Sequence, residues 1–199
     1  MKVTTDKSTM NKAIKELDQL DRYSLQIGLF GEDDSFIQMI AGVHEFGLTI
    51  RPKGKYLTIP TPEAGDRRAR DIPGLFKPKG KNILAVAGPD GKLTVMFYLK
   101  TEVNIPERSF LRSTFDEKSN KWGELFEGWI DDIIHGKLSA EQVYNRLGAK
   151  IVDDIQMKIV EIQTPAKSAA TLARNPRKNN PLIVTGKMKN SVTWKVMKS

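Results

Sequence analysis

The sequence predicts an α+β fold: a small, mainly antiparallel sheet packed against two long helices, with a β-rich insertion and an extended basic C-terminal segment. Apolar residues recur at helical spacing over 107–134 and 139–162, which predicts the two helices. Apolar and polar residues alternate over 23–30 and 191–197, as is typical of half-buried strands. Residues from about 48 to 102 contain short apolar segments broken by Pro and Gly, and this pattern indicates the β-rich insertion. A chain of 199 residues, 39% of them hydrophobic, can bury a core of its own.

The first fifty residues predict a helix, a strand and a second helix. Ser8 and Thr9 offer an N-cap for a short amphipathic helix, whose apolar face runs from Met10 to Leu20. The strand over 23–30 follows it. Asp34 then caps a second helix, which closes near Gly47.

The insertion predicts three strands, over 56–59, 83–86 and 93–99. The sequence Gly-Pro-Asp-Gly at 88–91 should join the last two as a hairpin. Residues 63–81 show no periodicity of their own, so we expect a long exposed loop there. Loops of that length in compact domains are either functional or disordered.

Ile105 and Pro106 lead into the longest helix, and Pro106 is expected at a first-turn position, where its missing N–H costs nothing. A face of large rings on this helix is more typical of a core seam than of a ligand site. The seam comprises Phe110, Leu111, Phe115, Trp122, Phe126, Trp129 and Ile133. Ser139 and Gln142 form a capping box that opens the next helix.

The C-terminal segment, 162–199, differs in character from the body formed by 1–161. It contains several helix breakers and ends in the alternating strand, whose Trp194 we expect to dock on the sheet. We expect 174–190 to run exposed and to meet a subunit, a neighbouring ring or DNA. The residues that we expect to form the structural core are Ile105, Pro106, Phe110, Leu111, Trp122, Trp129 and Trp194.

The formal net charge of +8 is unevenly distributed along the chain. Residues 162–199 carry eight Lys/Arg and no acid, and 51–81 carry nine basic residues against three acids. Residues 116–161 hold ten acids against six basic residues, so we expect a positive and a negative side. Most such runs are solvated surface; the alternatives are head-to-tail assembly or a nearby polyanion. The candidates for an interface or a DNA channel are Arg67, Arg68, Arg70, Arg108, Arg177, Lys178, Lys187 and Lys189.

The catalytic patterns that we tested do not fit the sequence. The chain has no cysteine, which excludes disulfides, thiolate metal sites and a cysteine nucleophile. His44-Glu45 lacks the second histidine of a metalloprotease helix. The acid pairs at 131–132 and 153–154 point about 100° apart on their helices, and we expect them to be solvated. No apolar run reaches the roughly 18–20 residues of a membrane span. We therefore expect a soluble protein that is not an enzyme and that holds no metal or cofactor.

Four segments, in order, are similar to motifs of one protein family. Residues 43–47 (VHEFG) match a helix end before a variable region, and Val103–Arg112 (VNIPERSFLR) match an apolar-x-Ile-Pro-x-Arg-x-Phe-Leu-Arg pattern. Thr164–Arg174 (TPAKSAATLAR) match a Pro-x-Ser-x-x-Thr segment, and Pro181–Ser191 (PLIVTGKMKNS) match a Pro-Leu-Ile-x-Thr-Gly pattern. The chain thereby resembles the tail-completion, or virion-morphogenesis, proteins of tailed bacteriophages, which are neck components that join tail to head. It departs from them in the insertion and at Val184, where the family usually has an acid.

The resemblance implies a structural neck protein of the virion, synthesised in the cytoplasm of the host bacterium. It implies a six-fold ring of identical chains with DNA passing through it, and other phage neck and tail proteins as partners. The alternative, from another functional class, is a non-specific DNA-binding protein whose basic loop and C-terminal segment bind phosphates. Neither basic segment has interleaved aromatic residues or a helix-turn-helix pattern, so sequence-specific readout is not expected.

Overall fold

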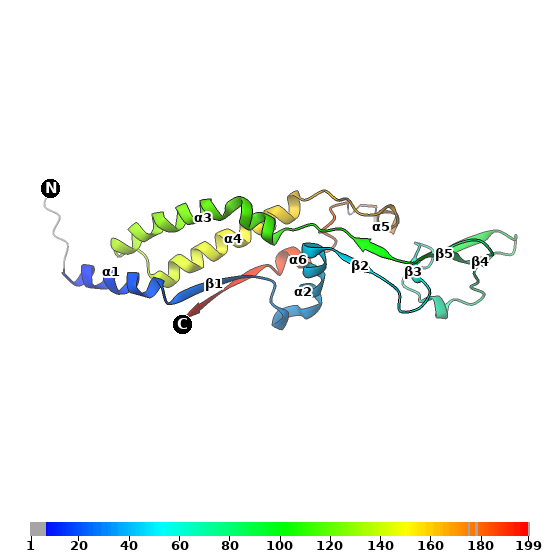
Figure 1. The fold of residues 1–199 in the computed structure, drawn as a ribbon, viewed down its shortest axis with the longest axis horizontal. Coiled ribbons are helices and arrows are strands. Elements are labelled where there is room, and N and C mark those ends of the chain that lie inside the picture. The colour runs from blue at the N-terminus through cyan, green and yellow to red at the C-terminus, as the bar shows by residue number, and fades with distance from the viewer. Residues whose placement is uncertain (1–6, 175, 178, 199) are drawn as a thin grey trace. The chain divides into compact units, whose positions relative to one another are not determined.

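The computed structural model describes residues 7–174, 176–177 and 179–198, and the chain is α+β, as predicted. Figure 1 shows the course of the chain. The chain divides into two compact units. The helical unit consists of residues 1–45, 109–162 and 182–199, and the β-rich unit consists of 46–108 and 163–181.

The segment 162–199, which we expected to be one basic tail, is shared between the units. Residues 163–181 belong to the β-rich unit, and the last stretch returns to the helical unit. The reason is burial: Leu182, Met188 and Val192 are part of the helical unit's core. Apolar side chains of this size are more stable in a core than along an exposed arm.

The helical unit is built on a two-stranded antiparallel sheet. It contains α1 (Lys7–Leu20), β1 (Tyr23–Gly28), α2 (Gly31–Phe46) as far as Glu45, α3 (Leu111–Ile134), α4 (Ala140–Glu161), α6 (Lys187–Asn190) and β7 (Thr193–Lys198). β1 and β7 pair from Tyr23 opposite Lys198 to Gly28 opposite Thr193. α4 packs on both strands, and α3 packs on α4, on the same side of the sheet (Figure 1). The terminal strand therefore docks on the sheet, as predicted.

The core of the helical unit lies between the long helices and the sheet. Phe110 and Trp122 are buried, as expected. Trp122 Nε1 donates a hydrogen bond to Asp154 Oδ2 at 2.9 Å, and Lys150 Nζ donates to Asp154 Oδ1 at 3.0 Å. Of the acid pair that we expected to be solvated, Asp153 is exposed but Asp154 is buried, so the expectation is wrong for Asp154. The two donors offset the cost of burying its charge. The other expected core residues are half-buried: Ile105, Pro106, Leu111, Trp129 and Trp194.

The β-rich unit contains a three-stranded sheet and a separate ribbon. Its elements are β2 (Leu48–Ile50), β3 (Leu57–Pro60), a short 3-10 turn η1 (Ala69–Asp71), β4 (Ile83–Ala87), β5 (Leu93–Lys100), β6 (Val103–Ile105) and α5 (Ala169–Arg174). The sheet is antiparallel in the order β3-β5-β4, and β4 and β5 form the predicted hairpin. β2 and β6 form the ribbon, with Leu48 opposite Ile105 and Ile50 opposite Val103.

The segment 63–81 is a long and mostly exposed loop, as predicted, but a few of its residues anchor it to the sheet. Ala64 and Ile72 are buried in a cluster with side chains of β5. Phe76 forms an isolated antiparallel bridge with Ala85, with backbone hydrogen bonds of 3.0 and 2.9 Å. The apolar residues of this segment are few and irregularly spaced. Ala64, Ile72 and Phe76 nevertheless each contact the sheet.

The longest helix begins later than its pattern predicts. We expected a start at 107, but α3 starts at Leu111, and Pro106 lies outside it. Phe110 is the N-cap residue, and its side chain makes no capping hydrogen bond. A distant side chain performs that role, as described below.

A glycine on α4 leaves room for the ring of Trp194. A Cβ atom added to Gly148 would lie 2.4 Å from Trp194 Cδ1. The indole Nε1 also donates to Asn145 Oδ1 at 3.1 Å. The position of β7 on α4 therefore depends on the absence of a side chain at 148.

We expect Gly148→Ala to lower the free energy of unfolding by about 1–3 kcal/mol, because the added methyl overpacks the contact with Trp194. Gly128→Ala on α3 is the matched control, because nothing lies within 4 Å of an added Cβ there. That change should raise stability by up to about 1 kcal/mol through helix propensity. Urea unfolding of both variants tests the pair, and equal effects would contradict this description of β7.

Candidate functional site

The carboxylate of Glu45 caps the start of α3. Glu45 lies in the last turn of α2 and is only 2% exposed. Its Oε2 accepts hydrogen bonds from the backbone N–H groups of Phe110 at 2.8 Å and Leu111 at 2.9 Å. Its Oε1 accepts from the N–H of Arg112 at 3.0 Å and from Ser109 Oγ at 2.7 Å. The N–H groups that a helix start leaves unpaired are thus bound by a residue of another helix.

Arg112 balances the buried charge. Its Nε lies 3.1 Å from Glu45 Oε1, and its Nη2 donates to the backbone carbonyl of Glu45 at 2.7 Å. Burial alone would raise the pKa of Glu45. Hydrogen bonds from the Ser109 hydroxyl and from three backbone N–H groups outweigh that effect and hold the pKa below its ordinary value. The carboxylate is therefore charged at the positive end of the α3 dipole.

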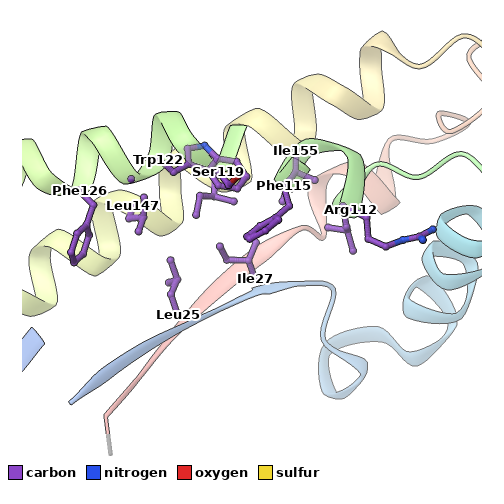
Figure 2. Close-up of a pocket in the computed structure, with 12 residues that line it drawn as sticks. Leu25, Ile27, Arg112, Phe115, Ser119, Trp122, Phe126, Leu147 and Ile155 are labelled. Atoms are coloured by element: carbon purple, nitrogen blue, oxygen red, sulfur yellow. The ribbon is translucent and has the colours of Figure 1, made fainter. Parts of the chain in front are cut away.

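An apolar groove of about 590 Å³ opens beside this junction, between α3, α4 and β1. Figure 2 shows Leu25 and Ile27 extending from β1 toward the helices, with Ile27 beside Phe115 of α3. The lining residues are Leu25, Ile27, Leu111, Arg112, Phe115, Ser119, Trp122, Gly123, Phe126, Leu147, Ile151 and Ile155. Phe115 is 62% exposed, so the predicted core seam is incomplete at this position. The groove can hold apolar groups and offers no pair of ionisable side chains for acid–base chemistry.

The β-rich unit concentrates the positive charge of the chain. By sequence it has 16 Lys/Arg and 6 Asp/Glu, a net +10, whereas the helical unit has 16 and 18, a net −2. It includes two basic segments that are far apart in the sequence, 51–81 and 163–181. Arg174 Nη2 lies 3.7 Å from Asp66 Oδ1, and Ala169 of α5 lines a hollow with β3 and β5. The two basic segments therefore lie in contact.

The three arginines predicted in the basic loop have different environments. Arg67 donates from Nε to the carbonyl of Ala64 at 3.1 Å and from Nη2 to a second loop carbonyl, so it holds its own turn together. Arg68 and Arg70 share the carboxylate of Asp71, at 2.8 and 3.7 Å. Both side chains are largely exposed and remain candidates for contact with an anion.

Arg108 is not an exposed interface residue, so that prediction is wrong. It is buried, and it donates from Nε to the carbonyl of Pro165 at 2.6 Å and from Nη2 to that of Ala166 at 3.0 Å. These bonds attach the segment after α4 to the end of the β2–β6 ribbon. The guanidinium can be buried because two backbone carbonyls accept its hydrogen bonds. From its charge alone, an exposed position would be expected.

The four C-terminal candidates do not form one cluster. Arg177 is exposed in the β-rich unit, and Lys178 lies outside the described residues. Lys187 and Lys189 belong to the helical unit, where Lys187 Nζ pairs with Asp34 Oδ2 at 2.6 Å. Asp34 has a non-helical backbone that interrupts α2 after its first turn, and its side chain caps the longer part of that helix through the N–H groups of Phe36 and Ile37, as predicted.

Comparison with family models, with curated proteins and with solved structures gave no match. Within the described ranges, no group of three or more His, Asp or Glu side chains could hold a metal ion. No helix in the described part of the chain is long and apolar enough to cross a membrane. The candidate site is therefore composed of surfaces: the apolar groove of the helical unit and the basic β-rich unit.

We expect Glu45→Ala to lower the free energy of unfolding by about 3–5 kcal/mol at neutral pH, because it removes the carboxylate that pairs with Arg112 Nε and accepts from three backbone N–H groups. The control is Glu117→Ala, which removes an exposed partner of Lys158 and should cost less than about 1 kcal/mol. Urea unfolding of the two variants measures both costs, and a similar small cost for each would contradict the role of Glu45 as a cap.

The same effect should depend on pH. Because the pKa of Glu45 is lowered on folding, its contribution is present above the unfolded pKa and is lost as the pH falls through the folded pKa. The stability difference between wild type and Glu45→Gln should therefore be constant near neutral pH and shrink on acidification. A difference that does not change with pH would contradict a charged cap.

Proposed function

We propose that this chain is a structural protein of the neck of a tailed bacteriophage, acting in tail completion at the head–tail interface. In this proposal it is not an enzyme. It forms a six-fold ring with further copies of itself, and it binds other neck and tail proteins. DNA passes through the ring.

One observation supports the proposal most: the four segments that resemble the family have linked structural roles. Glu45, in the first segment, caps the helix that begins in the second. Arg108, in the second, donates to the carbonyl of Pro165 in the third. Leu182 and Met188, in the fourth, are buried in the core that contains Phe110 of the second. Residues far apart in the sequence are thus used together, as expected if the patterns are parts of one inherited structure.

The distribution of charge is compatible with this role. A β-rich unit of net +10 suits contact with DNA or with an acidic partner, through a long-range field. A helical unit that is nearly neutral overall, with an open apolar groove, suits contact between proteins.

In the phage that encodes this chain, we expect loss of the chain to leave heads and tails that are not joined, as seen by electron microscopy. Wild type and Glu117→Ala should restore joined particles when supplied in trans. Glu45→Ala should restore fewer, because it weakens the start of α3. Joined and infectious particles in the absence of the chain would refute the proposed role.

The net charge of the β-rich unit supports a second candidate function, that of a non-specific DNA-binding protein. Lys53, Lys79 and Lys81 are exposed in that unit and can reach phosphates. In this case the purified monomer should bind any duplex, with an affinity that falls steeply as salt is raised.

Charge reversal distinguishes the two candidates. If the β-rich unit grips DNA, Lys53→Glu, Lys79→Glu and Lys81→Glu together should weaken duplex binding and lower the salt slope by about 1 for each phosphate that is no longer bound. Reversal of three exposed lysines of α1 in the helical unit (Lys7, Lys12 and Lys15) is the matched control and should change little. Equal weakening by both triple variants would show that only net charge matters.

A further inference from the structure

The β2–β6 ribbon has an apolar face that is exposed along β2 and half-buried along β6. Four apolar residues lie on one face of the ribbon: Leu48, Ile50, Val103 and Ile105. Leu48 is directly opposite Ile105 and Ile50 is opposite Val103, and alternate residues of a strand point to the same side. Leu48 is 45% exposed and Ile50 is 37% exposed. A two-stranded ribbon is only marginally stable by itself, so packing against another surface would stabilise it.

The groove of the helical unit is the complementary feature. It is open and apolar, and Phe115 in its wall is largely exposed. Its volume of about 590 Å³ is enough for several large apolar side chains.

The charges around the two surfaces are opposite. Arg51, Lys53 and Lys55 directly follow β2, and all three are exposed. Arg51 also pairs with Glu102, beside β6, at 3.5 Å. α3, which forms one wall of the groove, carries six acids and three basic residues. Asp116 and Glu127 are exposed on this helix, each within one turn of a groove-lining residue. An apolar contact would therefore be flanked by attraction between basic and acidic side chains.

We propose that the apolar face of the β2–β6 ribbon of one copy docks in the groove of a second copy. The ribbon and the groove are different surfaces, so the contact is heterologous and repeats from head to tail. Such a contact either closes into a ring or continues as a filament. The inference rests on the self-association that is part of the proposed function, and it names the surfaces that meet.

Disulfide trapping tests this contact, because the chain has no cysteine of its own. Ile50→Cys is placed in the ribbon and Phe115→Cys in the groove, on separate chains of which one carries a size tag. Leu125→Cys replaces Phe115→Cys in the control, because Leu125 is also exposed on α3 but does not line the groove. Circular dichroism checks that each variant is folded.

On mixing and oxidation, we expect several-fold more tagged heterodimer from the 50 and 115 pair than from the 50 and 125 pair. Equal yields, or no heterodimer although sedimentation shows that the chain self-associates, would overturn this contact and leave the ring standing. A chain that remains monomeric and gives no heterodimer would overturn the ring together with it. The double variant Ile50→Cys/Phe115→Cys, oxidised at high dilution, tests folding back within one chain. Internally linked monomer there, without heterodimer in the mixture, would also overturn the proposal.

Discussion

The buried carboxylate of Glu45 is the interaction on which most of the helical unit depends. It supplies acceptors for the N–H groups of the first turn of α3, where Phe110 cannot cap the helix itself. It thereby fixes the start of α3 relative to α2. The position of α3 in turn places Leu111 and Phe115 in the wall of the apolar groove. A cap from a distant residue binds two helices together, whereas a local cap stabilises only one.

The two units combine different surface properties in one chain. The helical unit has a packed core with an open groove, and its net charge is close to zero. The β-rich unit has a smaller core and carries all of the chain's excess positive charge. Arg108 holds the basic segment after α4 in the β-rich unit through backbone carbonyls. The role proposed above would use this separation, because apolar association and strong like charge oppose each other on one surface.

Features with a local signal could be predicted from the sequence, and features that depend on distant partners could not. The capping box at Ser139 and the hairpin at 88–91 are present as predicted, because their residues interact within a few positions. Glu45 accepts hydrogen bonds from residues 64 to 67 positions away, which leaves no periodic or spacing signal. For the same reason the sequence predicts surface positions for Asp154 and Arg108. Their partners, Trp122 and two backbone carbonyls, are recognisable only in the folded chain.

Hydrogen exchange of the full chain at the amides of Phe110, Leu111 and Arg112 tests the central claim most directly. First-turn amides of a helix usually exchange rapidly, because they lack partners within the helix. If the Glu45 carboxylate holds these three amides, they should be protected as strongly as the core of α4, and Glu45→Gln should selectively reduce that protection. Rapid exchange at all three in the wild type, with α4 still protected, would show that α3 frays at its start and that the carboxylate does not organise the unit.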